Sequence, residues 1–535
     1  MQRSDLSKSE EENVSHAAGV ISVFTFLSRI LGLIRDMVIA AFFGTGMIAD
    51  AFVVAFRIPN LLRRLFAEGS LTIAFIPVFT EYLSRKSKED AFDMARVVLT
   101  LLSLILSVVT MLGVIFAPWI VRLQAFGFGA SGDQFELTVL LTRITFPYIL
   151  LVSIVAFFMG VLNSLRRFAA PAAAPIFLNV GIIGAAYLIS PHLQAPVVGV
   201  ALGVIIGGIL QVVLQIPWVY REGMNLFPRW QPGHPAVKQI GLLMLPTVFG
   251  SAVYQLNSFI GTLLASFLEK GSVSSLYFAD RLVQLPLGVF AISIATALLP
   301  SLSTHAVGED LNGFEKTLNH SMRLVFFIAL PATAGLIVLG EPIIRVLLER
   351  GDFNPGSTHM THQALIFYSV GLWAYSGIRI LLAAFYAVQD TKTPVKVAFV
   401  AFFVNLIAAI ALMRPLAHGG IALALSVSSS VQFCLLLFLL KKKVRLTSLN
   451  SVLFSFLKST LASVIMGLGV FYLHSVWLTI DPSEGPWHMV PELLVLVVTG
   501  IGIYVGMARI LGCKELTSIQ EMFKPFLRKL RDERD

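Results

Sequence analysis

Long apolar segments recur along almost the whole chain and are separated by short polar connections. A membrane-spanning helix needs about 20 consecutive, mostly apolar residues, and these segments are too continuous for the alternating pattern of an outer-membrane barrel. The pattern therefore predicts an all-α polytopic membrane protein with about 14 transmembrane helices. The predicted spans lie near residues 17–44, 47–83, 92–121, 136–165, 172–190, 196–220, 239–268, 273–304, 318–348, 362–388, 394–413, 419–440, 451–475 and 490–511.

Two of these spans contain residues that predict local features of their helices. Residues 47–83 would extend about 55 Å as one straight helix, whereas the hydrocarbon core is about 30 Å thick. This span must tilt, protrude or break, and Pro59 and Gly69-Ser70 are the expected places for a break. In the sixth span, glycine recurs at every fourth position, which predicts close packing against another helix. These glycines are Gly199, Gly203 and Gly207.

Composition agrees with a membrane protein. Of the 535 residues, 56% are hydrophobic and only 13% are charged, whereas soluble proteins carry about 25% charged residues. The two cysteines, Cys434 and Cys513, are too few for a disulfide framework, and no set of residues has convincing metal-ligand spacing. No GxxxxGK[ST] stretch is present. The sequence therefore predicts no P-loop ATPase, no metal and no cofactor.

Membrane topology explains the net charge of +9. Lys and Arg concentrate in alternate connections, which include residues 85–88, 166–167, 221–229, 392–396 and 441–445. By the positive-inside rule these connections face the cytoplasm and the intervening ones face outward. We therefore expect both termini to be cytoplasmic, and no nucleic acid is needed to explain the basic residues.

An internal repeat relates two parts of the chain. Residues 160–171 align without a gap with residues 383–394, 223 positions later, and Pro59 has a counterpart in Pro286. Six spans separate equivalent elements, so both copies share one orientation. This predicts two six-helix lobes in a parallel pseudo-twofold repeat, with the axis along the membrane normal. Chance recurrence of proline and aromatic residues is the alternative.

The repeat and the apolar pattern together predict the domain boundaries. We expect the first apolar segment to be a retained helix rather than a cleaved signal, because no small-residue cleavage site follows it. The expected parts are a cytoplasmic leader (1–16), an N-terminal six-helix lobe (17–230), a C-terminal six-helix lobe (231–445), two additional transmembrane helices (446–512) and a cytoplasmic tail (513–535).

Charged and polar residues inside three predicted spans are the most informative feature of the sequence. An Arg or Asp at mid-bilayer costs about 2.5–3.5 kcal/mol, so these side chains must face water or pair with partners. Several are seven positions apart, or two helical turns, and would form polar stripes; in the first span Arg29 and Asp36 would share a stripe, and Arg35 would lie about 120° away from it. The residues are Arg29, Arg35 and Asp36 in the first span, Asp50, Arg57, Asn60, Arg63, Arg64 and Glu68 in the second, and Asp280 and Arg281 in the eighth.

Two interpretations of these charges remain open. They could be structural pairs that anchor the topology, or they could line a water-filled cationic cavity. The residues named above comprise six Arg and four carboxylates, and the three spans hold no Lys, so pairing among these residues cannot neutralise all of them. The surplus suits an anionic ligand, and Arg favours phosphate because its planar guanidinium binds two oxygens at once.

The same stretches carry a family resemblance. Residues 28–36 (SRILGLIRD), 49–69 (ADAFVVAFRIPNLLRRLFAEG), 145–151 (TFPYILL) and 277–282 (YFADRL) are specific motifs, and the similarity spans nearly the whole chain. The chain resembles the MurJ (MviN) family of bacterial lipid II flippases, in the MOP exporter superfamily. The resemblance implies two six-helix lobes with two C-terminal helices, in the bacterial cytoplasmic (inner) membrane.

The resemblance also implies roles for individual residues. Its essential cavity arginines fall on Arg29, Arg35, Arg63 and Arg281, which we expect to bind substrate. Supporting cavity or gating roles are expected for Asp36, Asp50, Asn60, Arg64, Glu68 and Asp280.

The implied substrate is lipid II, the undecaprenyl-diphosphate-linked disaccharide-pentapeptide used for peptidoglycan synthesis. The protein would flip it from the inner to the outer leaflet by alternating access and would not be an enzyme. Cell-wall synthesis proteins are possible partners. Two alternatives remain open: a multidrug or other lipid exporter of the same superfamily, and a membrane enzyme that processes polyprenyl-phosphate.

Overall fold

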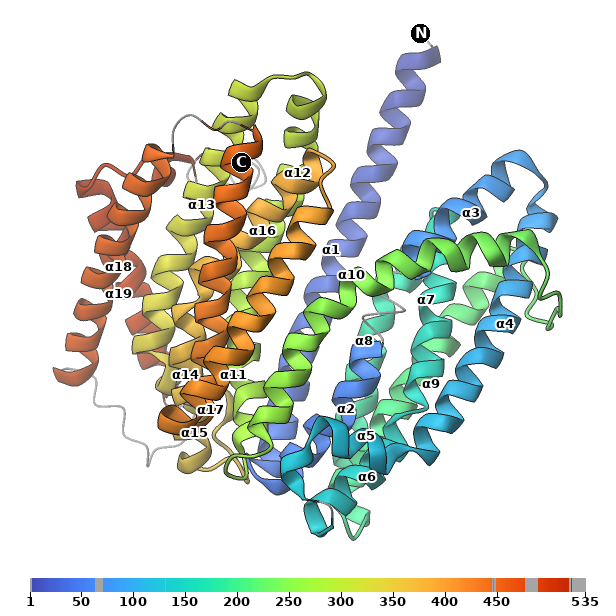
Figure 1. The fold of residues 1–535 in the computed structure, drawn as a ribbon, viewed down its shortest axis with the longest axis horizontal. Coiled ribbons are helices and arrows are strands. Elements are labelled where there is room, and N and C mark those ends of the chain that lie inside the picture. Colours follow the sequence, from blue (N-terminus) through green and yellow to red (C-terminus); the bar gives the residue numbers. More distant parts are fainter. Residues whose placement is uncertain are drawn as a thin grey trace, which may run out of the picture. The chain divides into compact units, whose positions relative to one another are not determined.

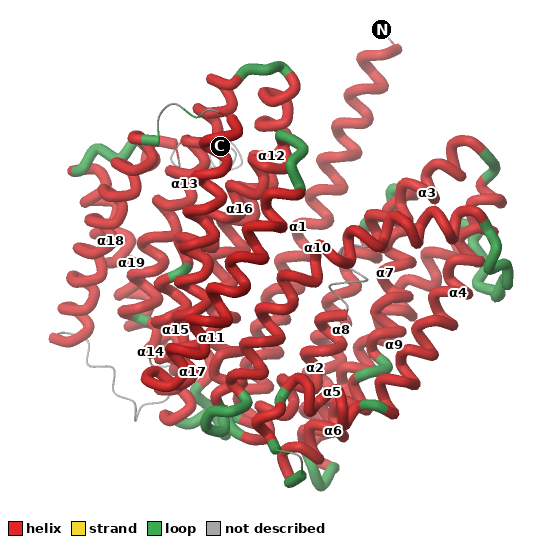
Figure 2. The backbone as a smooth tube through the Cα atoms, in the orientation of Figure 1, coloured by secondary structure: helices red, strands yellow, loops and turns green. Residues whose placement is uncertain are grey.

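The computed structural model describes residues 2–62, 71–129, 131–444, 446, 449–476, 489–518 and 521, with the side chains of residues 2–18, 62, 72, 73 and 245–254 excepted. Within these ranges the regular secondary structure is helical, without strands (Figure 2). The predicted all-α class is confirmed. The chain divides into two compact units, residues 1–274 and 275–535.

The first unit contains ten α-helices within its described residues (Figure 1). They are α1 (Gln2–Phe43), α2 (Met47–Leu62), α3 (Leu71–Arg85), α4 (Lys88–Ile115), α5 (Ala117–Gln124), α6 (Asp133–Thr145), α7 (Tyr148–Ser164), α8 (Ala169–Leu188), α9 (Pro196–Arg221) and α10 (Pro235–Ala265).

The division between the units falls inside α11, which is counted here among the nine described helices of the second unit. They are α11 (Ser272–Pro286), α12 (Ile292–Val307), α13 (Leu311–Val338), α14 (Gly340–Leu348), α15 (Pro355–Val370), α16 (Leu372–Ala387), α17 (Lys392–Val444), α18 (Asn450–Val476) and α19 (Met489–Ile510). A π-helical turn, Leu287–Ala291, joins α11 to α12.

Each of the fourteen predicted segments overlaps one or more helices in the residues that the structure describes. Among the described residues, nine helices are long and apolar enough to cross a membrane, or ten if the α15–α16 pair, bent by 45°, is one span. This number of candidate spans is lower than the predicted fourteen partly because α17 contains two predicted spans, 394–413 and 419–440. They lie on either side of a non-helical Ala417 (φ 48°). The count of fourteen therefore stays a prediction.

The described residues of the long second span form α2 and α3. Helix α2 continues through Pro59 to Leu62. The other expected position for a break, Gly69-Ser70, lies outside the described residues, as do Arg63, Arg64 and Glu68.

Close packing of α8 on α9 depends on glycine, as predicted. A Cβ atom at Gly203 would lie 2.9 Å from the backbone oxygen of Gly181, and one at Gly207 would lie 2.8 Å from the Cα of Leu178. Backbone atoms cannot move aside as a flexible side chain can. Small residues at these positions therefore let the two helices approach closely.

Helix boundaries repeat at an almost constant shift along the chain. Helix α4 (88–115) corresponds to α13 (311–338), with both ends 223 positions apart, and α8 begins 223 positions before α17. The turns between equivalent helices also match: Arg166 (φ 59°) and Gln389 (φ 57°) both adopt the left-handed conformation. Residues 223 positions apart thus have the same local geometry, which supports the predicted repeat.

Both turns end their helices with the same backbone hydrogen bonds. The amide of Arg167 donates to the Leu162 carbonyl at 2.8 Å, and the amide of Asp390 donates to the Phe385 carbonyl at 2.9 Å. This six-residue closure satisfies carbonyl groups that would otherwise be left unpaired at a helix C-terminus. The matching bonds explain why two non-glycine residues tolerate a positive φ.

An ion pair follows each turn, with opposite polarity in the two units. In the first, Arg167 Nε lies 2.6 Å from Glu222 Oε1, just beyond α9. In the second, Asp390 Oδ2 lies 2.6 Å from Lys443 Nζ, at the end of α17. Burial raises the pKa of Asp390, but hydrogen bonds from Lys443 and Thr393 outweigh it and hold this pKa well below its usual range. The pair is therefore intact at neutral pH.

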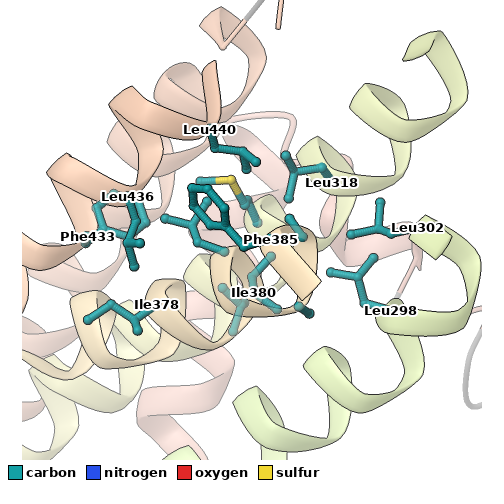
Figure 3. Packing of buried hydrophobic residues seen from close by; sticks show 14 of the residues in the cluster. Leu298, Leu302, Leu318, Ile378, Ile380, Phe385, Phe433, Leu436 and Leu440 are labelled. Atoms are coloured by element: carbon teal, nitrogen blue, oxygen red, sulfur yellow. The ribbon is translucent and has the colours of Figure 1, made fainter. Parts of the chain in front are cut away.

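The core of the second unit joins α12, α13, α16 and α17. Figure 3 shows Phe385 among leucine and isoleucine side chains from these helices, with Leu318 and Leu440 nearby. Phe385 and Leu440 are fully buried. Burial of a large apolar side chain contributes about 1.5–3 kcal/mol, so this cluster fixes the helices against one another.

The last two helices pack on α13 through a separate apolar cluster that includes Phe327, Met466 and Tyr504. The Tyr504 hydroxyl donates to the Phe327 carbonyl at 2.7 Å. Beyond α19, buried Glu515 lies 3.2 Å from Arg323 Nε on α13. These polar contacts fix the α18–α19 pair to the second unit.

The Asp390 ion pair gives a first prediction. Asp390→Asn should lower the unfolding free energy by about 1 kcal/mol, because Lys443 loses its partner and the start of α17 loses a charged cap. Thermal unfolding of the purified protein in detergent measures the change. Lys392→Gln is the matched control, since it removes an exposed neighbouring charge; equal melting temperatures for the two variants would contradict the prediction.

Candidate substrate-binding and gating site

Arg35 and Asp36 form a buried ion pair on α1. The side chain of Arg35 donates to Asp36 Oδ1 from Nε at 3.1 Å and from Nη2 at 2.7 Å. Its Nη1 donates to the amide oxygen of Asn179 on α8 at 3.1 Å. All three residues are buried. The guanidinium is therefore held in a fixed orientation inside the first unit.

Asn179 links this pair to the backbone of α1. Its amide nitrogen donates to the Ser28 carbonyl at 3.2 Å, while its oxygen accepts from Arg35. Sequence reasoning did not identify Asn179. The available signal was a single amide side chain within the apolar sequence of α8, where a polar group needs a partner.

Arg29 has a different environment from Arg35. The predicted stripe placed Arg29 on the same face as Asp36, two helical turns away, and placed Arg35 off that face. In the structure Arg29 is exposed, whereas Arg35 and Asp36 are buried together. Adjacent residues can pair because a long Arg side chain bends back toward its neighbour, which helical spacing alone does not reveal.

Asp50 caps the start of α11. Its Oδ2 accepts from the Gly271 amide, and its Oδ1 accepts from both the amide and the hydroxyl of Ser274, with all three distances at 2.7 Å. Asp50 is only 1% exposed. A buried carboxylate at a helix N-terminus satisfies backbone donors and interacts favourably with the helix dipole.

Arg57 makes a second contact from the same helix. Its Nη1 donates to the Ser258 carbonyl of α10 at 3.0 Å. Asp50 and Arg57 are two turns apart on α2, so one face of this helix holds both α10 and the segment that begins α11. Asn60, one turn further on, is half-buried.

In the second unit, Asp280 and Arg281 are both half-buried on α11. The Arg281 guanidinium lies 4.8 Å from the ring centre of Tyr277, and its Nη2 donates to the Tyr277 hydroxyl at 3.3 Å. Asp280 accepts a hydrogen bond from Gln284. Tyr277 was not expected as a partner, although its spacing of four residues from Arg281 places it on the same helical face.

No group of three or more His, Cys, Asp or Glu side chains in the described ranges is arranged to hold a metal ion. The chemistry available in the described site is therefore that of arginine, carboxylate and amide groups. Such groups can bind an anion and can exchange hydrogen-bond partners as helices move.

The fold is shared with MOP-superfamily transporters. A multidrug resistance MATE family transporter in an inward-facing conformation has a TM-score of 0.68 at 14% identity, covering 80% of this chain and 98% of its own. This likeness concerns the fold alone. Together with the apolar helices, it shows a polytopic membrane protein of this fold class.

Sequence comparison identifies the family within that class. A family model described as lipid II flippase MurJ matches residues 39–490. The probable lipid II flippase MurJ of Vibrio cholerae serotype O1 is 39% identical over 424 residues, covering 78% of this chain and 81% of the relative. The corresponding Bdellovibrio bacteriovorus protein is 35% identical over 525 residues, covering 97% and 98%. The chain belongs to the lipid II flippase MurJ family.

A solved structure agrees with this assignment. Lipid II flippase MurJ in an inward closed conformation has a TM-score of 0.78 and 30% identity, covering 92% of this chain and 98% of that chain. The expected family is thereby confirmed.

The cap on α11 gives a second prediction. Asp50→Asn should lower the unfolding free energy by about 1–3 kcal/mol, because an amide cannot accept hydrogen bonds at both of its ends. Hydrogen exchange at the Gly271 and Ser274 amides should accelerate. Ser274→Ala removes one of the three bonds and should have a smaller effect; an equal or larger loss from Ser274→Ala would contradict this account.

Proposed function

We propose that this protein flips lipid II from the inner to the outer leaflet of the bacterial cytoplasmic membrane. The observation that carries the proposal is the buried Arg35, oriented by Asp36 and Asn179, in a chain of the lipid II flippase MurJ family. An arginine kept inside a membrane helix at considerable cost indicates a functional site. The protein acts as a transporter, and no chemical step on the lipid is required.

Arginine chemistry fits the diphosphate of this substrate. A guanidinium offers several N–H donors in a rigid plane and binds two phosphate oxygens at once. In the proposal, the diphosphate binds in a water-filled cationic cavity, and the polyprenyl tail stays in the lipid. Arg29, Arg35, Arg63 and Arg281 would line this cavity.

Acidic residues would hold these arginines in position when no substrate is bound. Asp36 already holds Arg35, and Asp280 lies beside Arg281 on α11. An incoming diphosphate can replace a carboxylate as the partner of a guanidinium, since both offer paired oxygens. Substrate binding would thus exchange one set of charge-assisted bonds for another rather than expose an unpaired charge.

Alternating access requires a contact that opens on one side of the membrane. By the predicted topology, the connection between α1 and α2 and the connection before α11 face outward. Asp50 joins these two connections through Gly271 and Ser274. We propose that the Asp50 cap is part of an outward gate, closed in this structure, and that it breaks when the substrate is released.

The proposed architecture is the predicted pair of six-helix lobes, residues 17–230 and 231–445, in a parallel repeat. The constant shift of helix boundaries and the matching turns at Arg166 and Gln389 support it. The two units described above divide at residue 274 instead, because α10 packs against α3 and α5 of the first unit. The leader, residues 1–16, and the tail, residues 513–535, would both be cytoplasmic.

The principal alternative is export of a drug or another lipid. The fold does not separate these activities, since a multidrug transporter shares it. The arginines favour a substrate with concentrated negative charge. A polyprenyl-phosphate-processing enzyme is the weaker alternative, because it needs convergent acidic groups near a membrane surface, and the carboxylates described here are paired with Arg, capping a helix or hydrogen-bonded.

A third prediction tests the arginine chemistry. Arg35→Lys and Arg281→Lys should fail to replace the native flippase after its depletion, because lysine keeps the charge but cannot bind two oxygens in a plane. The measurement is lipid II accessible at the outer face, normalised to the amount of protein in the membrane. Arg143→Lys, at an exposed position on α6, should behave as the unsubstituted protein. Full activity of both test variants would reduce the role of arginine to diffuse positive charge.

A fourth prediction tests the gate. A Cβ atom built on Gly271 lies 3.5 Å from the Cβ of Thr45, which is within the range of about 3.5–4.5 Å found in disulfides. In a chain with Cys434 and Cys513 replaced by serine, Thr45→Cys with Gly271→Cys should crosslink on oxidation and stop flipping. Reduction should restore it.

Gly271→Cys alone is the control for this gate experiment. Gly271 has φ 95°, so the substitution strains the backbone whether or not a crosslink forms. Activity of the reduced double variant should equal that of the control. Undiminished flipping by the fully oxidised double variant would show that this contact need not open.

A further inference from the structure

The connection between α9 and α10, residues 222–234, is fixed in place although it contains no regular secondary structure. Arg96 on α4 donates from Nε to the Phe227 carbonyl at 3.0 Å, and the Arg229 amide donates to the Thr100 hydroxyl at 2.9 Å. The Arg229 side chain pairs with Asp93. Three contacts therefore attach the middle of this connection to one helix.

Two large aromatic side chains nevertheless remain outside. Phe227 is 73% exposed and Trp230 is 64% exposed. Near the two ends of the connection, Met224 and Ala236 are buried. The exposed rings are thus held on an ordered backbone rather than on a loose loop, so ordering them on a surface costs little conformational entropy.

The contacts on α4 give the membrane depth of these rings. Helix α4 has charged residues up to Arg96 and none from Val97 to Ile115, so the hydrocarbon core begins near Val97. The attachment points Asp93, Arg96 and Thr100 lie on either side of this transition. The first and last of them are seven positions apart, or about 10 Å along the helix axis.

The same face of α4 continues into the lipid-facing surface. At 100° per residue, Leu104 and Met111 share the face of Asp93 and Thr100, and they are 49% and 62% exposed. The connection therefore lies against the side of α4 that faces lipid, at the level where the polar part of the helix ends.

The charge around the connection suits an anionic surface. Residues 85–96 and 221–238 together hold seven Lys or Arg and four Asp or Glu. Arg221 and Lys238 are exposed at the two ends of the connection. Basic residues close to a membrane surface are attracted to anionic lipid headgroups, and tryptophan prefers the headgroup level because its ring is apolar and its N–H is polar.

We propose that residues 222–234 are a membrane-surface anchor, in which Phe227 and Trp230 insert at the headgroup level and the surrounding basic residues bind anionic lipid. The anchor sets the depth of α10, which begins five residues after Trp230. It depends on α4 crossing the membrane and not on the identity of the transported lipid, so its failure would leave the proposed flipping activity untouched.

Spin labels on the purified full-length protein test the anchor. With Cys434 and Cys513 replaced by serine, single cysteines are introduced by Phe227→Cys, Trp230→Cys and Gly233→Cys. The protein is reconstituted in phosphatidylethanolamine–phosphatidylglycerol vesicles. For each label we compare the collision rate with oxygen to the collision rate with a water-soluble nickel complex. This ratio should be several-fold higher at positions 227 and 230 than at position 233. Gly233 is the matched control because open space surrounds its position.

Two further variants retain both aromatic rings, so they test the anchor even if substitution of Phe227 or Trp230 prevents folding. Gln231→Cys retains both rings, and its label should show intermediate nickel access. Arg221→Gln with Lys238→Gln should reduce the dependence of label depth on the fraction of phosphatidylglycerol. Full water access at 227, 230 and 231 in vesicles would overturn the proposal. Protection in native membranes but not in vesicles would also overturn it, because a protein partner would then cover the surface.

Discussion

Hydrocarbon provides no partner for a charge, and this constraint determines where the polar side chains of the described helices lie. Arg35 is held by Asp36 and Asn179, Asp50 accepts three hydrogen bonds, and Arg57 reaches a carbonyl of α10. The contacts of Arg35 with Asn179, of Asp50 with Gly271 and Ser274, and of Arg57 with Ser258 join segments that are distant in the sequence. Ion pairing and helix packing therefore depend on each other, since loss of either leaves a buried charge uncompensated.

The same constraint makes such contacts suitable for switching. A buried carboxylate that caps a helix can leave only when water or another donor replaces its partners. The Asp50 cap is compact, with two acceptor oxygens and three donors at 2.7 Å. It can therefore define two discrete arrangements, with the cap either complete or fully hydrated, which is what a transport cycle requires.

The helices were predictable because apolar length is a strong signal, and the family was recognisable from motifs that combine charge with proline and glycine. The partners of the charged side chains were harder to predict from the sequence. Spacing along α1 linked Arg29 to Asp36, whereas the structure pairs Arg35 with Asp36, because a flexible side chain reaches a neighbour that a helical projection places elsewhere. Asn179 and Ser274 were missed for another reason: their contacts connect residues 144 and 224 positions apart, and helix periodicity carries no information about such pairs.

The reversed ion pairs at the two repeated turns have a consequence for assembly. Two similar halves that enter the membrane one after the other risk exchanging equivalent elements. If the turn of the first half met the helix end of the second, Arg167 would face Lys443. The complementary exchange would bring Asp390 against Glu222. Both mismatched combinations place like charges together, so the charges of each turn favour the helix end in its own unit over the equivalent helix end of the other unit.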